Sequence, residues 1–184
     1  MRWDDLFRDL EAQLAAAEAV DLDAEVADRT RRESARLGLV DRARGAVGSR
    51  ITAQVRGAGP VRGVLLEVGS QWLLVGEDGG REAVLPLPAV LSVAGLTAWS
   101  GVPGAAGQVF DRLGLGSALR GIARDRAPVS VQLLDGSTVS GTIDRVGADF
   151  LELSTRDVAE PVRTGRPVVR TVPFAAVAVV RSGP

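Results

Sequence analysis

The amino-acid sequence predicts a mainly β protein with an N-terminal α-helix, followed by two tandem five-stranded small barrels that are each preceded by a short helix. Three observations predict this fold. One stretch of the chain is repeated, short runs rich in Val, Leu and Ile alternate with turn residues in both copies, and the N-terminal residues are apolar at helical spacing. The 184 residues are enough for one large domain or two small ones.

The internal repeat appears when the chain is aligned with itself. At a shift of 78 positions, residues 51–75 lie on residues 129–153 without a gap. At a shift of 87 positions, residues 84–93 lie on residues 171–180, and the tetrapeptide RLGL recurs at a shift of 76. Three aligned blocks in the same order predict two copies of one structural unit. The identical pairs of the first block are Gln54/Gln132, Val61/Val139, Gly63/Gly141, Val68/Val146, Gly69/Gly147 and Leu73/Leu151.

Each copy is predicted to hold a short helix and then five strands. Asp41 and Ser117 are the expected N-caps of the two helices, because a side-chain oxygen there accepts hydrogen bonds from free backbone amides. Asp135-Gly136 predicts a tight hairpin turn in the second copy. The strands are expected near 50–56, 61–68, 71–76, 81–87 and 89–94, and near 128–134, 138–146, 149–155, 168–173 and 176–182.

A glycine interrupts the second expected strand of both copies, at Gly63 and Gly141. Inside a strand, glycine marks a bend or a close approach of two backbones. A second strand that bends and is shared by both halves of a small sheet lets five strands curl into a barrel.

Residues 1–35 are predicted to form an acidic amphipathic helical arm. Trp3, Phe7, Leu10 and Leu14 follow one helical stripe, and the opposite face is acidic. One long helix and two helices split near Asp21 both fit the sequence. We expect the apolar stripe to pack on a barrel or on a partner chain, which makes these four residues candidate oligomer or partner contacts.

The charge distribution supports this division of the chain. The arm holds 10 acidic residues against 5 arginines, whereas residues 36–98 and 112–184 carry net charges of +2 and +3. The predicted organisation is therefore the arm at 1–35, a first repeat at 36–98, a Gly/Pro linker at 99–111 and a second repeat at 112–184. The basic excess of the repeats is far below that of a dedicated nucleic-acid-binding domain.

The composition excludes several kinds of site. The chain has no Cys and no His, so it has no disulfide, no thiol nucleophile, no Ser-His-Asp triad and none of the usual ligands of zinc or haem. Carboxylate sites for magnesium or calcium remain open in principle, but Asp144, Asp149, Glu77, Asp78 and Glu82 are interpreted as turn and surface residues. We expect no enzymatic activity, no cofactor or metal, and no small-molecule substrate.

We also expect a cytoplasmic protein that does not enter a membrane. Charged residues are spread through the first 14 positions, so the sequence predicts no apolar signal region there. They are Arg2, Asp4, Asp5, Arg8, Asp9 and Glu11. The longest uncharged stretch, residues 83–110, is interrupted by Pro86, Pro88 and Pro103, which a membrane helix would not tolerate.

A short helix followed by five bent strands, with VSVQLLDGSTVSGTIDRVGADFLELS over three strands of the second copy, resembles the Sm-like (LSm) fold, an SH3-like small barrel. The LLDG…VSG layout and the closing AAVAVVRS are similar to the Sm1 and Sm2 segments of that family. The resemblance covers both repeats as a tandem pair. The whole chain, with its MRWDDLF start, also resembles actinobacterial proteins of unknown function with an N-terminal helical arm.

The resemblance does not extend to the RNA site of the family. Uridine-binding Sm proteins carry an Asp and an Asn after the second-strand glycine. Here Gly147 takes the place of that Asp, and the chain has no Asn. The Arg-Gly of Sm2 is broken, since the second copy has Arg181-Ser182-Gly183. No residue of this chain therefore inherits the base-stacking role.

These observations favour a non-enzymatic assembly or interaction protein that acts through strand-edge and helix-mediated contacts and forms a homo-oligomer. The repeats could pair within one chain or between chains. The alternative is an RNA- or DNA-binding protein that uses the Arg-rich loop 156–170. Its candidate phosphate contacts are Arg156, Arg163, Arg166 and Arg170.

Removal of residues 1–35 tests the role of the arm. If the apolar stripe joins chains, light scattering should give a lower assembly mass for the truncated chain than for the full chain. An unchanged mass would exclude the arm as the element that drives assembly.

Overall fold

The structure is a computed structural model that describes residues 37–96, 113–155 and 168–182. These residues form ten strands and two α-helices, so the described part of the chain is mainly β, as predicted. The expected helical arm at 1–35 and the linker at 99–111 lie outside the described residues.

Every strand expected from the repeat is present, and each begins and ends within two residues of its predicted bounds. We call the described residues 37–96 the first repeat and the described residues from 113 to 182 the second repeat. The first repeat contains α2 (Leu39–Arg44), β1 (Arg50–Val55), β2 (Gly59–Val68), β3 (Trp72–Glu77), β4 (Glu82–Pro86), the 3₁₀ turn η1 (Leu87–Ala89) and β5 (Val90–Ala94). The second contains α3 (Leu115–Arg124), β6 (Pro128–Leu133), β7 (Thr138–Val146), β8 (Phe150–Thr155), β9 (Val168–Pro173), the 3₁₀ turn η3 (Phe174–Ala176) and β10 (Val177–Ser182).

All ten strands belong to one antiparallel sheet with the order β5-β1-β2-β3-β4-β10-β6-β7-β8-β9. Each repeat contributes five neighbouring strands in the same internal order, and β4 of the first repeat pairs with β10 of the second. The pairings among the described strands do not close either set of five into a barrel. The described part of the chain is thus one open sheet, with β5 and β9 as its edges.

The two repeats bend at the same place. The register of β2 against β3 shifts between Leu65 and Glu67, and that of β7 against β8 shifts between Ile143 and Arg145. These positions are equivalent in the 78-residue alignment. A bulge bends its strand and increases the local twist. The bent second strand is therefore present in both repeats.

Two apolar cores lie along the sheet, and each includes residues of the other repeat. The first is built mainly from β1 to β4, and it also contains Ala178 and Val179 of β10. The second is built mainly from α3 and β6 to β10, and it also contains Trp72 and Val84. Because the cores share elements, both repeats belong to one compact unit, Leu39–Pro184.

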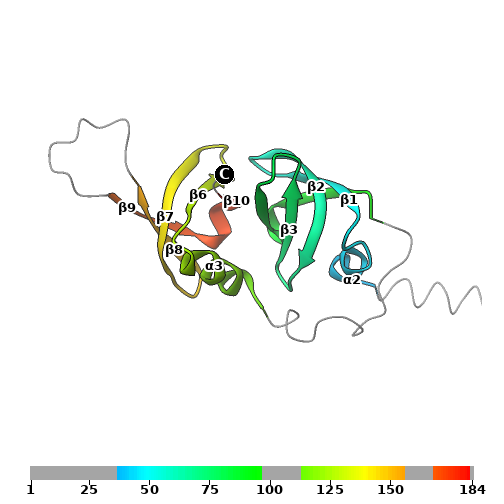
Figure 1. The fold of residues 1–184 in the computed structure, drawn as a ribbon, viewed down its shortest axis with the longest axis horizontal. Coiled ribbons are helices and arrows are strands. Elements are labelled where there is room, and N and C mark those ends of the chain that lie inside the picture. Colours follow the sequence, from blue (N-terminus) through cyan, green and yellow to red (C-terminus); the bar gives the residue numbers. More distant parts are fainter. Residues whose placement is uncertain (1–36, 97–112, 156–167, 183–184) are drawn as a thin grey trace, which may run out of the picture. The chain divides into compact units, whose positions relative to one another are not determined.

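The helices begin earlier than predicted. Helix α2 lies beside β2 and α3 beside β7 (Figure 1). Asp41 and Ser117 lie inside the helices instead of capping them; Asp41 accepts a hydrogen bond from Arg44, and the Ser117 hydroxyl accepts one from Arg120. The N-cap of α3 is Gly114, whose backbone is extended.

The interrupting glycines mark close backbone approaches. A Cβ on Gly63 would lie 2.1 Å from the carbonyl oxygen of Gly76 on β3, and a Cβ on Gly141 would lie 2.3 Å from that of Ser154 on β8. No real Cβ fits at such a distance without movement of the backbone. The glycines therefore let the second and third strands of each repeat pack at the bend.

The substitution Gly63→Ala should destabilise the protein by about 1–3 kcal/mol, because the new methyl group forces two paired strands apart. The matched control is Gly79→Ala, where an added Cβ meets no atom within 4 Å. Urea unfolding of both variants measures the difference. Equal midpoints for Gly63→Ala and the control would show that β2 and β3 tolerate a side chain at the bend.

Candidate interaction site: the strand junction and the two open edges

The junction between the repeats is a short antiparallel pairing of β4 with β10. Val84 lies opposite Val180, and Ala83 lies opposite Arg181. The side chains of Val84, Val180 and Ala83 are buried. The backbone of one edge strand in each repeat thus forms hydrogen bonds with an edge strand of the other repeat. The same kind of pairing occurs where edge strands of two chains meet.

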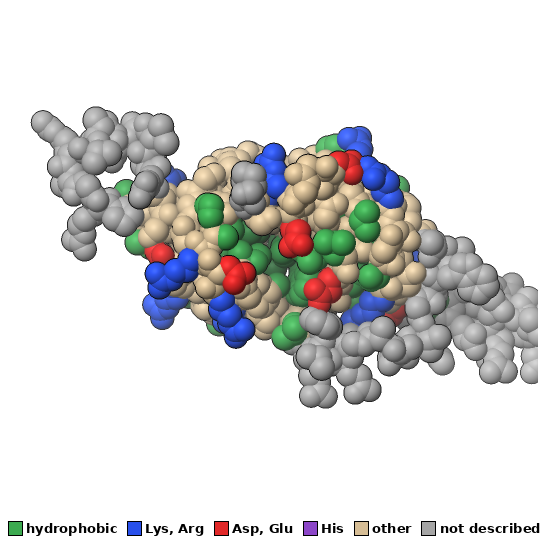
Figure 2. Space-filling model, in the orientation of Figure 1, with side chains coloured by type: hydrophobic (Ala, Val, Ile, Leu, Met, Phe, Trp, Pro, Cys, Tyr) green, Lys and Arg blue, Asp and Glu red, His purple; other side chains and the backbone are tan. Residues whose placement is uncertain are grey.

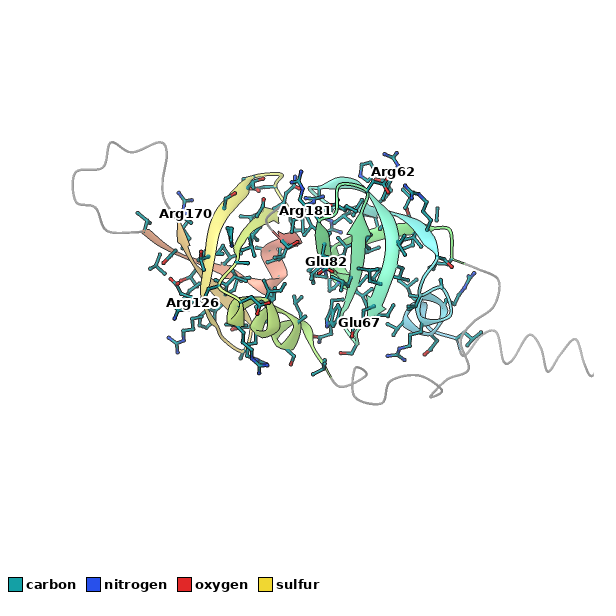
Figure 3. The ribbon with its side chains drawn as sticks, viewed as in Figure 1. Arg62, Glu67, Glu82, Arg126, Arg170 and Arg181 are labelled. Carbon is teal, nitrogen blue, oxygen red and sulfur yellow. The ribbon has the colours of Figure 1, made fainter. Side chains whose placement is uncertain are left out.

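A polar cluster surrounds this pairing. The guanidinium of Arg181, which is labelled in Figure 3, donates through Nε to Glu77 Oε2 at 2.9 Å and through Nη1 to Gln132 Oε1 at 3.1 Å. The side chains of Arg181 and Glu77 are only 19% and 21% exposed. The backbone amide of Glu82 also donates to Ser182 Oγ at 3.0 Å. The register of the junction is therefore set by charge as well as by backbone pairing.

The start of α3 makes a second contact between the repeats. Trp72 of β3 donates through Nε1 to the carbonyl oxygen of Leu113 at 3.0 Å, and the amide of Leu115 donates to Gln71 Oε1 at 3.4 Å. Both Trp72 and Leu115 are buried. The first repeat therefore supplies an acceptor for a backbone amide at the start of a helix in the second repeat, and Trp72 and Leu115 belong to the same core.

The edge strands β5 and β9 each pair on one side only among the described strands. They carry three of the large apolar side chains that remain exposed in the described residues. Leu91 on β5 is 61% exposed, and Val168 and Val169 on β9 are 44% and 55% exposed. An edge strand offers a row of backbone donors and acceptors to another strand, and exposed apolar side chains favour its burial.

The site residues predicted from sequence lie only partly within the described chain. Arg170 lies on β9, at an open edge, and its side chain is exposed. The other candidate phosphate contacts (Arg156, Arg163 and Arg166) and the candidate partner contacts (Trp3, Phe7, Leu10 and Leu14) lie outside the described residues. The sequence did not decide whether the repeats pair within one chain or between chains. In the structure they pair within one chain, through β4 and β10. The residues of the junction itself gave no signal in the sequence beyond their place in the repeat.

One face of the molecule carries no single strong basic patch among its described residues. On the face drawn in Figure 2, arginine side chains lie in several separate groups, with acidic side chains among them. Arg50, for example, donates to the exposed carboxylate of Asp78. This surface does not have the continuous positive charge that would follow a nucleic-acid backbone.

Two carboxylates within the described segments have shifted pKa values, for different reasons. Burial raises the pKa of Glu67 on β2, and its Oε1 atom is buried without a hydrogen-bond partner among the described residues. Hydrogen bonds from the hydroxyl and amide of Ser137 hold the pKa of Asp135 below its usual value. Asp135 belongs to the predicted hairpin turn, so this second shift reflects turn structure.

The described residues contain no cluster of three or more carboxylates, His or Cys that could hold a metal ion. Their helices are also too short or too polar to cross a membrane. No protein-family model and no curated protein matches the chain.

The substitution Arg181→Met should lower the free energy of unfolding by about 1–3 kcal/mol, because it leaves the half-buried Glu77 carboxylate without its partner. The control is Arg50→Met, which breaks an ion pair whose side chains are both 63% exposed. That change should cost less than about 1 kcal/mol. Urea unfolding checks both values, and equal losses would mean that the junction cluster adds no more than a surface ion pair.

Proposed function

We propose that this chain is a non-enzymatic interaction protein, built from two Sm-like units, that binds protein partners through its open strand edges. The observation that supports this most is the β4–β10 junction, where one repeat already binds the other by adding a strand to its edge. The edge strands β5 and β9 also offer backbone donors and acceptors to a further strand.

The Sm-like part of the proposal is supported by the order of elements. Each repeat has a short helix and then five strands, its fifth strand pairs with the first, and its long second strand bends at a bulge. This arrangement agrees with the resemblance of the repeats to the Sm1 and Sm2 segments. The proposal extends that resemblance from the sequence to the architecture.

The mode of binding follows from the physics of an open edge. A partner strand that pairs with β5 or β9 gains main-chain hydrogen bonds, and contacts with the neighbouring side chains give specificity. In such a complex, the exposed apolar side chains of Leu91, Val168 and Val169 would be buried against the partner strand, and their removal from water would favour binding. Nucleic acid is less favoured by the described residues, because among them Phe150 and Phe174 are half-buried and Trp72 is buried, and none of these rings is fully exposed to stack on bases.

Light scattering on a sizing column tests the proposal, with absorbance at 260 and 280 nm followed across the peak of a gentle low-salt preparation. We expect a mass above the 19.2 kDa of one chain and a protein-like absorbance ratio. Val169→Lys, on an open edge, should reduce the assembly mass, because a charge on an edge strand opposes pairing. Val47→Lys is the control, since Val47 is similarly exposed but lies outside the strands.

Two results would contradict the proposal. One is a single-chain mass in that preparation together with fast hydrogen exchange at the amides of β5 and β9. The other is a high absorbance at 260 nm that nuclease treatment removes, which would favour the nucleic-acid function instead.

A further inference from the structure

One surface of the first repeat combines apolar side chains with carboxylates. We call it the β2–β4 patch, and it consists of Leu66 and Glu67 on β2, Leu74 and Gly76 on β3, and Glu82 on β4. Leu66 is 41% exposed and lies over Gly76, where an added Cβ would be 3.2 Å from Leu66 Cδ1. Leu74 is half-buried beside it. Figure 2 shows apolar and acidic side chains together near the centre of the face it draws.

Each end of the patch holds a carboxylate that is available to a cation. Oε1 of Glu67 is buried and has no hydrogen-bond partner in the described part of the chain, and burial raises the pKa of this side chain. The carboxylate of Glu82 is exposed, and within the described residues only its backbone groups form hydrogen bonds, with Ser182. Both glutamates are labelled in Figure 3. A carboxylate that is partly removed from water gains stability when a basic side chain binds beside it.

The equivalent surface of the second repeat differs, because its polar groups are paired within the chain. At the shift of 78 positions, the counterparts of Leu66, Glu67, Leu74 and Gly76 are Asp144, Arg145, Glu152 and Ser154. Asp144 accepts a hydrogen bond from the Ser154 hydroxyl, and Arg145 lies opposite Glu152 in the strand register. Opposite charges on facing strands stabilise one another. The first repeat has the same strand pairing here, with apolar side chains and an unpartnered carboxylate in place of these polar pairs.

We propose that the β2–β4 patch binds a cationic segment of another protein. One basic side chain of the segment pairs with Glu67 and another with Glu82, and an apolar side chain between them packs on Leu66 and Leu74. The sign of the charge selects this class of partner, because two carboxylates attract Lys or Arg and repel the phosphates of a nucleic acid. The patch lies on inner strands of the sheet, so this binding does not depend on the proposed function of the edges β5 and β9.

The spacing of the two carboxylates fits an extended peptide. Glu67 lies opposite Leu74, and Glu82 lies opposite Gly76. The glutamates are therefore two strand spacings apart across the sheet and two residues apart along it, which places their Cα atoms about 12 Å from one another. In an extended peptide, residues i and i+4 are about 13 Å apart and lie on the same side as residue i+2. The segment that fits has a basic residue, an apolar residue two positions later and a second basic residue two positions after that.

A synthetic peptide with this pattern tests the site. The probe is Arg-Ser-Leu-Ser-Arg, acetylated and amidated so that its termini carry no charge. When it is titrated into the isotope-labelled full chain, the backbone amide resonances of Leu66, Leu74 and Gly76 should shift and saturate. The amide resonances of Asp144 and Ser154, on the equivalent surface of the second repeat, should stay in place.

Two control peptides examine charge and spacing separately. Glu-Ser-Leu-Ser-Glu reverses the charge, and Arg-Ser-Leu-Arg-Ser has the composition of the probe but turns its second arginine to the opposite side of an extended chain. Both should bind at least about fivefold more weakly than the probe.

Variants of the chain then assign the binding to named residues. Glu67→Gln and Glu82→Gln should each raise the Kd of the probe by about two- to fivefold. The matched control is Glu152→Gln, which removes a carboxylate from the equivalent surface of the second repeat and should leave the Kd unchanged. Urea unfolding separates binding from folding. Because Glu67→Gln removes a desolvated charge, its unfolding midpoint should stay the same or rise while the probe binds more weakly.

Three results would overturn the proposal. One is the absence of saturable shifts at the patch, and another is equal affinity for the probe and the charge-reversed peptide. The third is a lower assembly mass for Glu82→Gln with unchanged binding of the probe, which would make a second copy of this chain the occupant. None of these variants alters β5 or β9, so weaker binding of the probe at an unchanged assembly mass concerns this site alone.

Discussion

The pairing of β4 with β10 is the constraint on which the rest of the structure depends. Five strands in a row leave two edges, and an isolated edge exposes backbone groups and apolar side chains to water. The chain removes one edge of each repeat by pairing them with one another, and Arg181, held by Glu77 and Gln132, fixes the register. Residues of each repeat then enter the core of the other, which makes the two repeats one compact unit.

The bend of the second strand makes this arrangement compatible with two small cores. Because Gly63 and Gly141 have no Cβ, the backbones of Gly76 and Ser154 can approach them closely. A bulge lies beyond each glycine and bends its strand, β2 after Leu65 and β7 after Ile143. Both of these side chains are buried. Curvature within each repeat and pairing between repeats therefore have separate causes. The curvature comes from local close contacts at glycine, and the pairing comes from hydrogen bonding between the backbones of two edge strands.

The same constraint connects structure with the proposed function. A duplicated unit that uses only half of its edge strands inside the chain presents the other half outside. Some exposed positions on β5, β9 and α2 have equivalents that are buried in the other copy: Leu91 is equivalent to Ala178, Thr171 to Val84, and Leu39 to Leu115. An interaction protein with such edges needs no catalytic group, since backbone hydrogen bonds and apolar burial supply the binding energy. The separate arginine groups on the face in Figure 2 and the buried or half-buried aromatic residues of the described segments agree with this interpretation.

The sequence by itself determined the ten strands, the hairpin at Asp135-Gly136 and the duplication, because side-chain alternation, turn residues and repeated apolar patterns are local properties of the chain. It placed the helix caps wrongly at Asp41 and Ser117. The side chain that accepts a hydrogen bond from the Leu115 amide is Gln71, 44 residues earlier, and no local sequence pattern predicts so distant a partner. The β4–β10 pairing, the open sheet and the shared cores were decided by tertiary structure alone. Both repeats supply an equivalent pair of edge strands, and only packing in space determines which edges are covered.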